Sequence, residues 1–254
     1  MSVETEKEDP DYGTPRSGVD KDELHREMLT RHKEAFDAVA TQYQQAMDDM
    51  EFAFMPDKQW DAWMRETRSG RPMYTVNRLR QAIKQITNDQ RQNRPQVKVR
   101  AVEDGDMDLA EVRQGMIRNI DSSSDADRAR DTAFQFAVGG GFGVWRVNTQ
   151  YADDETFDQV IVKEEIADPY SVAFDPAAKQ KDRRDAMFAF VNTDMSRAEF
   201  KRKWPKADLK SVSTDKAGQS WFRDSDVTIA EYWYKEITEE TRVLLSNGDI
   251  LPLD

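Results

Sequence analysis

The chain has 254 residues, with 49 Asp and Glu against 37 Lys and Arg, six Trp and no cysteine. The missing cysteine excludes a disulfide scaffold, a thiolate zinc site, an iron–sulfur cluster and a cysteine nucleophile, and two histidines are too few for a multi-histidine metal site. No apolar run approaches the ~18 residues of a membrane span, so we expect no membrane partner, and the aromatic content of 10% indicates a chain that folds.

Residues 1–20 combine acids with Pro and Gly and have almost no apolar side chains, which predicts a flexible acidic arm and not a signal peptide. Residues 21–138 predict a mainly helical part, because apolar side chains recur there at spacings of three and four. One strand is expected at 96–102, where Val97 and Val99 alternate with polar residues. The expected helices run from near Asp22 to Pro56, briefly around Trp60 and Trp63, from Tyr74 to about Arg91, and from Leu109 to Val138 with a weak point at Ser122–Ser124.

Residues 139–254 predict a mainly antiparallel β part. Gly139–Gly141 should end the preceding helix, after which the apolar pattern changes to a period of two. A β-hairpin is expected from 143–149 and 159–166, and Ser196–Glu199 is a capping box that should begin a short helix. Further strands are expected at 171–174, 186–191 and 227–237, the last of them pairing with 241–245.

The predicted fold class is therefore α+β, with amphipathic helices in the N-terminal half and mainly antiparallel strands in the C-terminal half. Asn247–Gly248 is a turn signal, and a new apolar segment starts just before the last residue, Asp254. A finished domain seldom stops at such a point. We expect the chain to be the N-terminal portion of a longer protein.

No motif carries recognisable catalytic chemistry. The glycines at 139–143 follow a helix and precede a strand, the reverse of the order in a phosphate-binding loop, so a helix stop with tight packing is the favoured interpretation. His25 and His32 would lie ~10 Å apart on one helix, too far for one metal, and we expect a structural or surface role for them. Acidic pairs such as Glu164–Glu165 are expected to be solvated surface. We predict no catalytic residue, no metal site and no cofactor.

The net charge of −12 hides a local reversal. Residues 65–100 carry ten bases and two acids, a balance of +8, so the rest of the chain sums to −20. On the helix predicted within that window, Arg80, Lys84 and Arg91 form one stripe at i, i+4 and i+11. Such a stripe can pair with an acidic surface of the same chain or of a neighbouring subunit, stay solvated, or follow a nucleic-acid backbone. Charge pairing is favoured, because the same sequence supplies an acidic surface.

Several segments, taken in order, resemble the N-terminal part of tailed-phage portal proteins, in particular the P22-like portal family. The similarity extends from about Trp60 to about Leu245. It is carried by Gln59–Asp61, Arg91–Pro95, Phe142–Val147, Ile161–Asp175 and Thr228–Tyr234. The order and spacing of these segments are specific to the family, and none of them is catalytic. The resemblance therefore implies an architectural role and no enzyme.

The resemblance also implies that the chain is the wing-type region of a subunit in a dodecameric ring, the head-to-tail connector at one capsid vertex of the virion. DNA would pass through the ring during genome packaging and ejection without sequence-specific contacts. The implied partners are other copies of the chain, capsid coat protein, head-completion and tail adaptor proteins, and the terminase motor, with assembly in the host cytoplasm. Stem, clip and crown are expected to lie outside these residues.

Within such a ring we expect Arg80, Lys84 and Arg91 to lie at or near a subunit contact, because a ring repeats one contact between two different faces. Two other classes of protein are also compatible with the sequence. One is a metal-dependent phage nuclease that uses clustered Asp and Glu. The other is a monomeric protein-binding module.

Overall fold

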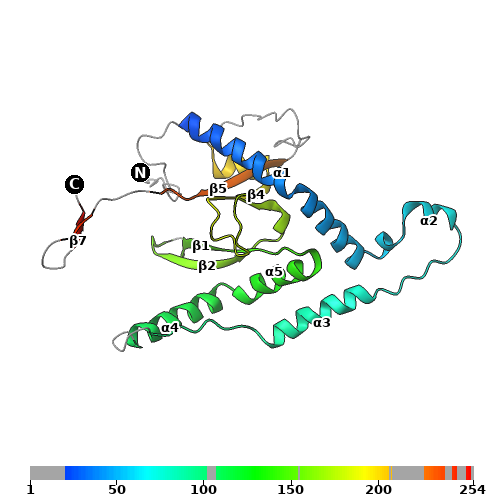
Figure 1. Cartoon of the computed structure of the whole chain (residues 1–254), viewed down its shortest axis with the longest axis horizontal. Helices are drawn as coiled ribbons and strands as arrows, with labels where there is room; N and C mark the ends of the chain where they lie inside the picture. Colours follow the sequence, from blue (N-terminus) through cyan, green and yellow to red (C-terminus); the bar gives the residue numbers. More distant parts are fainter. Residues whose placement is uncertain are drawn as a thin grey trace, which may run out of the picture.

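The computed structural model of the chain describes residues 21–101, 107–153, 155–205, 207, 226–237, 242–244 and 250–252. The fold is α+β, as predicted, with helices in the N-terminal half and antiparallel strands in the C-terminal half (Figure 1). The arm predicted at 1–20 lies outside the described residues. Within the described part of the chain, no helix combines the length and the apolar character needed to cross a membrane.

The helices of the N-terminal half follow the predicted apolar stripes. They are α1 (Lys21–Phe54), the 3-10 helix η1 (Pro56–Gln59), α2 (Ala62–Thr67), α3 (Arg78–Gln92), α4 (Met107–Ser123) and α5 (Ala126–Gly140). α1 ends just before Pro56, which confirms the predicted stop. α4 and α5 separate at the predicted weak point, where Asp125 adopts a left-handed backbone conformation with φ 49°.

α3 begins at Arg78 and not at Tyr74, as the apolar spacing had suggested. The reason is a side-chain cap, because Asn77 Oδ1 accepts a hydrogen bond from the Arg80 amide at 2.9 Å. Asn77 Nδ2 also donates to the Ala53 carbonyl near the end of α1 at 2.7 Å. One asparagine therefore sets the start of α3 and ties it to α1.

The strand predicted at 96–102 is wrong for the residues that the structure describes, because 96–101 join no β-ladder. Gln114 of α4 binds this segment instead. Its Oε1 accepts from the Val99 amide at 2.7 Å, and its Nε2 donates to the Val97 carbonyl at 2.8 Å. One side-chain amide thus satisfies the backbone groups that a neighbouring strand would otherwise bind.

The glycines after α5 act as a helix stop and a point of close packing, as predicted. Gly141 has φ 79°, a conformation that favours glycine, and its amide donates to the Ala137 carbonyl at 3.0 Å. Gly143 passes so close to α5 that a Cβ there would lie 1.8 Å from the Ala133 carbonyl oxygen. The chain can leave α5 at this sharp angle only because residue 143 has no side chain.

The C-terminal half contains three antiparallel sheets within the described residues. The predicted hairpin is confirmed, and its strands pair from Trp145 opposite Glu165 to Tyr151 opposite Gln159. The elements are β1 (Trp145–Tyr151), β2 (Gln159–Glu165), the 3-10 helix η3 (Pro169–Ser171), β3 (Val172–Phe174), β4 (Phe188–Ser196), α6 (Arg197–Lys203), β5 (Asp226–Tyr234), β6 (Arg242–Leu244) and β7 (Ile250–Pro252).

The second sheet has the order β3-β4-β5. The segment predicted at 241–245 does not pair with β5, because β6 forms its own two-stranded sheet with β7. The sequence does not distinguish a pairing of β6 with β5 from a pairing with β7, since β6 has an apolar neighbour on either side along the chain. The hairpin to β7 is the more local of the two pairings. The turn signal Asn247–Gly248 lies outside the described residues.

The core lies where α1 crosses the three-stranded sheet. Ala35 and Ala173 are fully buried there against Phe188 and Phe190. The Phe190 ring stacks on that of Tyr232, directly opposite on β5, with centroids 4.8 Å apart. Ala35 on α1 and Ala173 on β3 let the helix approach the sheet closely, and the large buried side chains, Phe188 and Phe190, come from β4.

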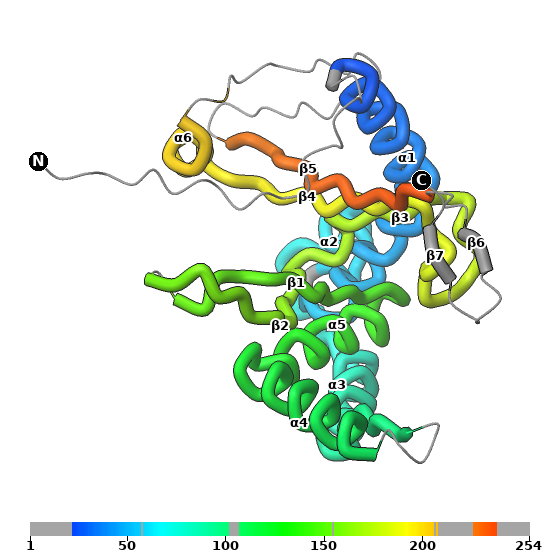
Figure 2. Tube along the Cα trace, turned by 90° about the vertical axis from the view of Figure 1, so that its left-hand side faces the viewer, coloured from blue at the N-terminus to red at the C-terminus, as the bar shows by residue number. Residues whose placement is uncertain are grey.

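Figure 2 shows two halves of the molecule. α1 lies with β3, β4 and β5 in the upper half, and the β1–β2 hairpin lies with α3, α4 and α5 in the lower half. α5 joins the two, because it packs against α1, α3 and β2. Its buried residues Ala126, Ala129 and Ala133 allow these neighbours to approach.

Candidate functional site

The basic stripe of α3 lies beside the contact between α3 and α5. Ile83, only 5% exposed, and Thr87 are the buried residues of α3. Next to them is a pocket of about 230 Å³ that Lys84 and Arg91 line together with Phe54 of α1 and Gln135 of α5. The stripe therefore borders a small hollow between three helices.

Arg91 pairs within the chain. Its Nε lies 3.1 Å from Asp131 Oδ2 on α5, and Arg94 Nη2 lies at the same distance from that oxygen. Arg94 also forms an ion pair with Asp127 one turn away. Two bases of the positively charged segment 65–100 thus form ion pairs with two acids of α5. This pairing helps to hold α3 against α5.

Arg80 and Lys84 differ from Arg91. Both side chains are exposed, and neither has a carboxylate within 4.0 Å among the described residues. The structure thus separates the stripe into one residue that the fold uses and two that present free charge to the surroundings. This division is invisible in the helical spacing, because it depends on where α5 lies.

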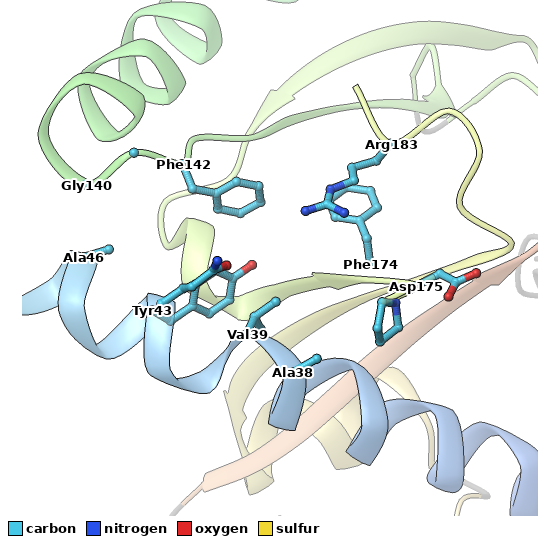
Figure 3. Close-up of a pocket in the computed structure, with 12 residues that line it drawn as sticks. Ala38, Val39, Tyr43, Ala46, Gly140, Phe142, Phe174, Asp175 and Arg183 are labelled. Carbon is cyan, nitrogen blue, oxygen red and sulfur yellow. The ribbon is translucent and has the colours of Figure 1, made fainter. Parts of the chain in front are cut away.

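A second pocket, of about 430 Å³, was not predicted from the sequence (Figure 3). α1 forms one side of it, with Tyr43 donating to the Val172 carbonyl at 2.6 Å. The rest of the pocket includes Phe142, just after α5, and Arg183, between β3 and β4. These two side chains point toward one another. The Tyr43 and Phe142 rings stack with centroids 5.6 Å apart. Burial raises the pKa of Tyr43, so this phenol stays neutral and acts as a donor.

Polar contacts shape the rim of this pocket. Asp175, only 7% exposed, accepts hydrogen bonds from the Ala177 amide at 2.8 Å and the Met187 amide at 3.1 Å. Arg183 has φ 55°, which is unusual for a residue other than glycine, and its Nη1 donates to the Ala178 carbonyl at 2.8 Å. Nothing in the sequence revealed that α1 and the end of α5 would complete a pocket here.

The histidines have the structural and surface roles that were expected. His32 packs against Phe36 and Phe190, with ring centroids 4.5 and 5.0 Å away, and its Nε2 lies 3.1 Å from Asn192 Oδ1. Burial lowers the pKa of His32. His25 is exposed.

The expectation of simple solvated acids is wrong for Glu164 and Glu165. Arg146 Nε lies 2.6 Å from Glu164 Oε2, and Arg128 Nε lies 2.8 Å from Glu165 Oε2. Thr132 of α5 also donates to Glu165 at 3.0 Å. These acids therefore fasten the hairpin to its surroundings, which the alternating pattern of a strand could not show.

Asp121 is similarly held. It accepts from Arg130 at 2.6 Å and also binds Lys163. Burial would raise the pKa of Asp121, but the hydrogen bonds from Lys163 and Arg130 outweigh it and hold this pKa below its ordinary value. Among the described residues, no group of three or more His, Cys, Asp or Glu could hold a metal ion. The carboxylates of these segments are thus engaged in structural pairs.

Comparison with known proteins shows that the chain is similar to phage portal proteins. A family model described as phage P22-like portal protein matches residues 29–253. A curated protein of Acyrthosiphon pisum secondary endosymbiont phage 1, named "Portal protein", is 28% identical over 230 residues. That alignment covers 85% of this chain and 32% of the relative, so the chain spans about a third of the relative's length.

Proposed function

The chain belongs to the phage P22-like portal protein family, and from this premise we propose that it is a structural subunit of the ring at one capsid vertex of a phage. DNA passes through this ring into the capsid during packaging and out of it at ejection, without sequence-specific contacts. The observation that carries the proposal is the family match over residues 29–253.

The surface of the described residues supports a subunit that neighbouring copies complete. α3 exposes Leu79 and Ile86, and α4 exposes Val112 and Met116, all in the same half of the molecule (Figure 2). Exposed apolar side chains are candidates for protein–protein contacts where they form a continuous surface. A ring of identical subunits covers such faces by repeating one contact around a closed circle.

The basic stripe belongs to this proposal. Arg80, Lys84 and Arg91 lie at or near the contact between ring subunits, where an acidic surface of the next copy faces them. Because Arg91 already pairs with Asp131, the accessible charge comes mainly from Arg80 and Lys84. Such exposed pairs contribute only ~0.2–1 kcal/mol each, so their main effect is to select the orientation of the two subunits.

The finer features of the proposal follow from the family. The ring is a dodecamer, and its partners are capsid coat protein, head-completion and tail adaptor proteins, and the terminase motor. It is built in the host cytoplasm and ends in the virion.

Light scattering of the purified chain tests the proposal. We expect a large, uniform assembly whose mass is a whole multiple of the 29.4 kDa chain. A strictly monomeric chain over a wide range of concentration and salt would contradict it. Incubation with DNA and magnesium is the companion assay, because cleavage would favour a nuclease and would contradict a purely structural role.

A further inference from the structure

The tip of the β1–β2 hairpin presents an aromatic side chain to the surroundings. Phe157 is 89% exposed, and its ring meets that of Tyr151 edge-on at 6.5 Å. Asp153 Oδ1 orders the turn by accepting from the Glu155 and Thr156 amides, each at 2.8 Å. An aromatic ring on an ordered turn can enter a pocket with little loss of conformational freedom.

The pocket near Tyr43 has the shape and chemistry to receive such a ring (Figure 3). Its volume of about 430 Å³ is in the range of binding pockets, ~300–1,000 Å³. Tyr43, Phe142 and Phe174 supply aromatic walls. Arg183, held in a left-handed conformation at its edge, marks a strained position of the kind that gathers at binding sites.

The charges around the two features are opposite. Within 179–184 the chain carries four bases and one acid, and only Arg184 has a carboxylate within 4.0 Å among the described residues, that of Asp182. The hairpin turn at 153–158 carries four acids and no base. Arg183 lines the pocket together with the acid Asp175, and the net positive charge of the adjoining segment 179–184 complements an acidic turn around an aromatic side chain.

The two features also lie on opposite sides of the molecule. In Figure 2 the tip of the β1–β2 hairpin extends to the left, and the chain between β3 and β4 lies to the right. One copy therefore cannot bring its own tip to its own pocket. Two different surfaces on opposite sides are what a head-to-tail contact between identical copies requires.

We propose that Phe157 of one copy inserts into the pocket lined by Tyr43, Phe142 and Phe174 of the next copy, with the acids of the hairpin turn facing the bases at 179–184. The occupant of the pocket is thus a second copy of this chain. This inference rests on the proposed ring, and it assigns a knob and a hole to the contact that the ring repeats. A central aromatic anchor in a pocket is the usual energetic centre of a protein interface.

Cysteine cross-linking tests the contact without background, because the chain has no cysteine of its own. One variant carries Phe157→Cys, and the other carries Gln42→Cys on the pocket wall. Mixing the two with a short bis-maleimide should give a cross-linked dimer, and one chain with both changes should give a ladder of higher multimers. The matched control replaces Gln42→Cys with Ser69→Cys, an exposed position just after α2 and away from both the pocket and the basic stripe of α3, which should give no ladder.

A second pair of variants tests the energetics. Because Phe157 is exposed within one copy, Phe157→Ser should leave the melting temperature of the monomer unchanged while raising the concentration needed for assembly by ~30-fold, as expected for an anchor of ~2 kcal/mol. Phe157→Tyr keeps the aromatic ring and should keep the assembly.

The outcomes separate this inference from the proposed function. The knob-and-hole contact would be overturned if assemblies form normally but give no Phe157–Gln42 cross-link. It would also be overturned if Phe157→Ser assembles like the wild type. Either result would leave the proposed ring unaffected. A wild-type chain that never assembles would overturn the ring, and this contact with it. A ladder confined to the chain with the Phe157→Cys and Gln42→Cys changes would support both.

Discussion

Arg146 on β1 donates through Nη1 to both carboxylate oxygens of Glu231 on β5, at 3.0 and 2.9 Å. Its Nε binds Glu164 on β2 at 2.6 Å, so one guanidinium joins the hairpin to the three-stranded sheet. Burial alone would lower the pKa of Arg146, but Glu231 and Glu164 outweigh it and raise this pKa. The hairpin and the three-stranded sheet are therefore linked by a charge-assisted contact.

Replacing this arginine should weaken the link between the sheets. Arg146→Gln leaves Glu164 and Glu231 without their shared cation, and we expect the free energy of unfolding to fall by ~1–3 kcal/mol. Urea denaturation measures the change. Glu231→Gln removes only one of the two partners and should cost less, so an equal or larger effect from Glu231→Gln would contradict the shared role of Arg146.

Two glycine substitutions should have opposite effects on stability. Gly143→Ala places a Cβ 1.8 Å from the Ala133 carbonyl oxygen, and the backbone must shift, so we expect a loss of at least ~3 kcal/mol or a failure to fold. Gly115→Ala lies within α4 with nothing within 4 Å of the new Cβ and should stabilise the chain by ~0.5–1 kcal/mol. Thermal unfolding of the two variants compares them; a harmless Gly143→Ala would be inconsistent with the close approach.

His32 should make stability depend on pH. Because burial lowers the pKa of His32 in the folded chain, the unfolded chain binds more protons once the pH falls below ~6.5. The stability that neutral His32 contributes is thus complete above ~6.5 and is lost as the pH falls toward the folded pKa. Denaturation between pH 5 and pH 7 should show this loss in the wild type and not in His32→Gln. His25→Gln, a change at an exposed position, should behave like the wild type.

The free bases of α3 should matter for assembly and not for folding. Arg80→Gln with Lys84→Gln removes two exposed charges, and we expect the assembly to dissociate at a lower salt concentration while the melting temperature of the monomer stays the same. Gln81→Glu with Gln85→Glu changes the net charge equally on other exposed positions of the helix. Light scattering across a salt series compares the pairs, and the proposed position of the stripe is wrong if both pairs behave alike.

The sequence predicted those elements whose pattern is local. α1 and the β1–β2 hairpin appear where apolar spacing and turn residues place them. The errors arose where distant residues decide the outcome. The segment at 96–101 alternates like a strand, but its partner is the Gln114 side chain. The pairing of β6 is a different case, because β6 forms a hairpin with β7 and not with β5, and the apolar pattern does not distinguish these two neighbours.

The candidate sites show the same limit. Helical spacing grouped Arg80, Lys84 and Arg91, but only the position of α5 reveals that Arg91 meets Asp131. The pocket near Tyr43 needs α1, the end of α5 and the β3–β4 connection together, and no single stretch of sequence contains this combination. Exposure of Phe157 likewise became visible only when the hairpin had been placed.

Electron micrographs of the purified chain test the proposed ring most directly. We expect particles with rotational symmetry and a central hole, because a head-to-tail contact between opposite faces closes into a circle. Isolated monomers, or open chains of varying length without a closed form, would contradict the proposal that this chain is a subunit of a portal ring.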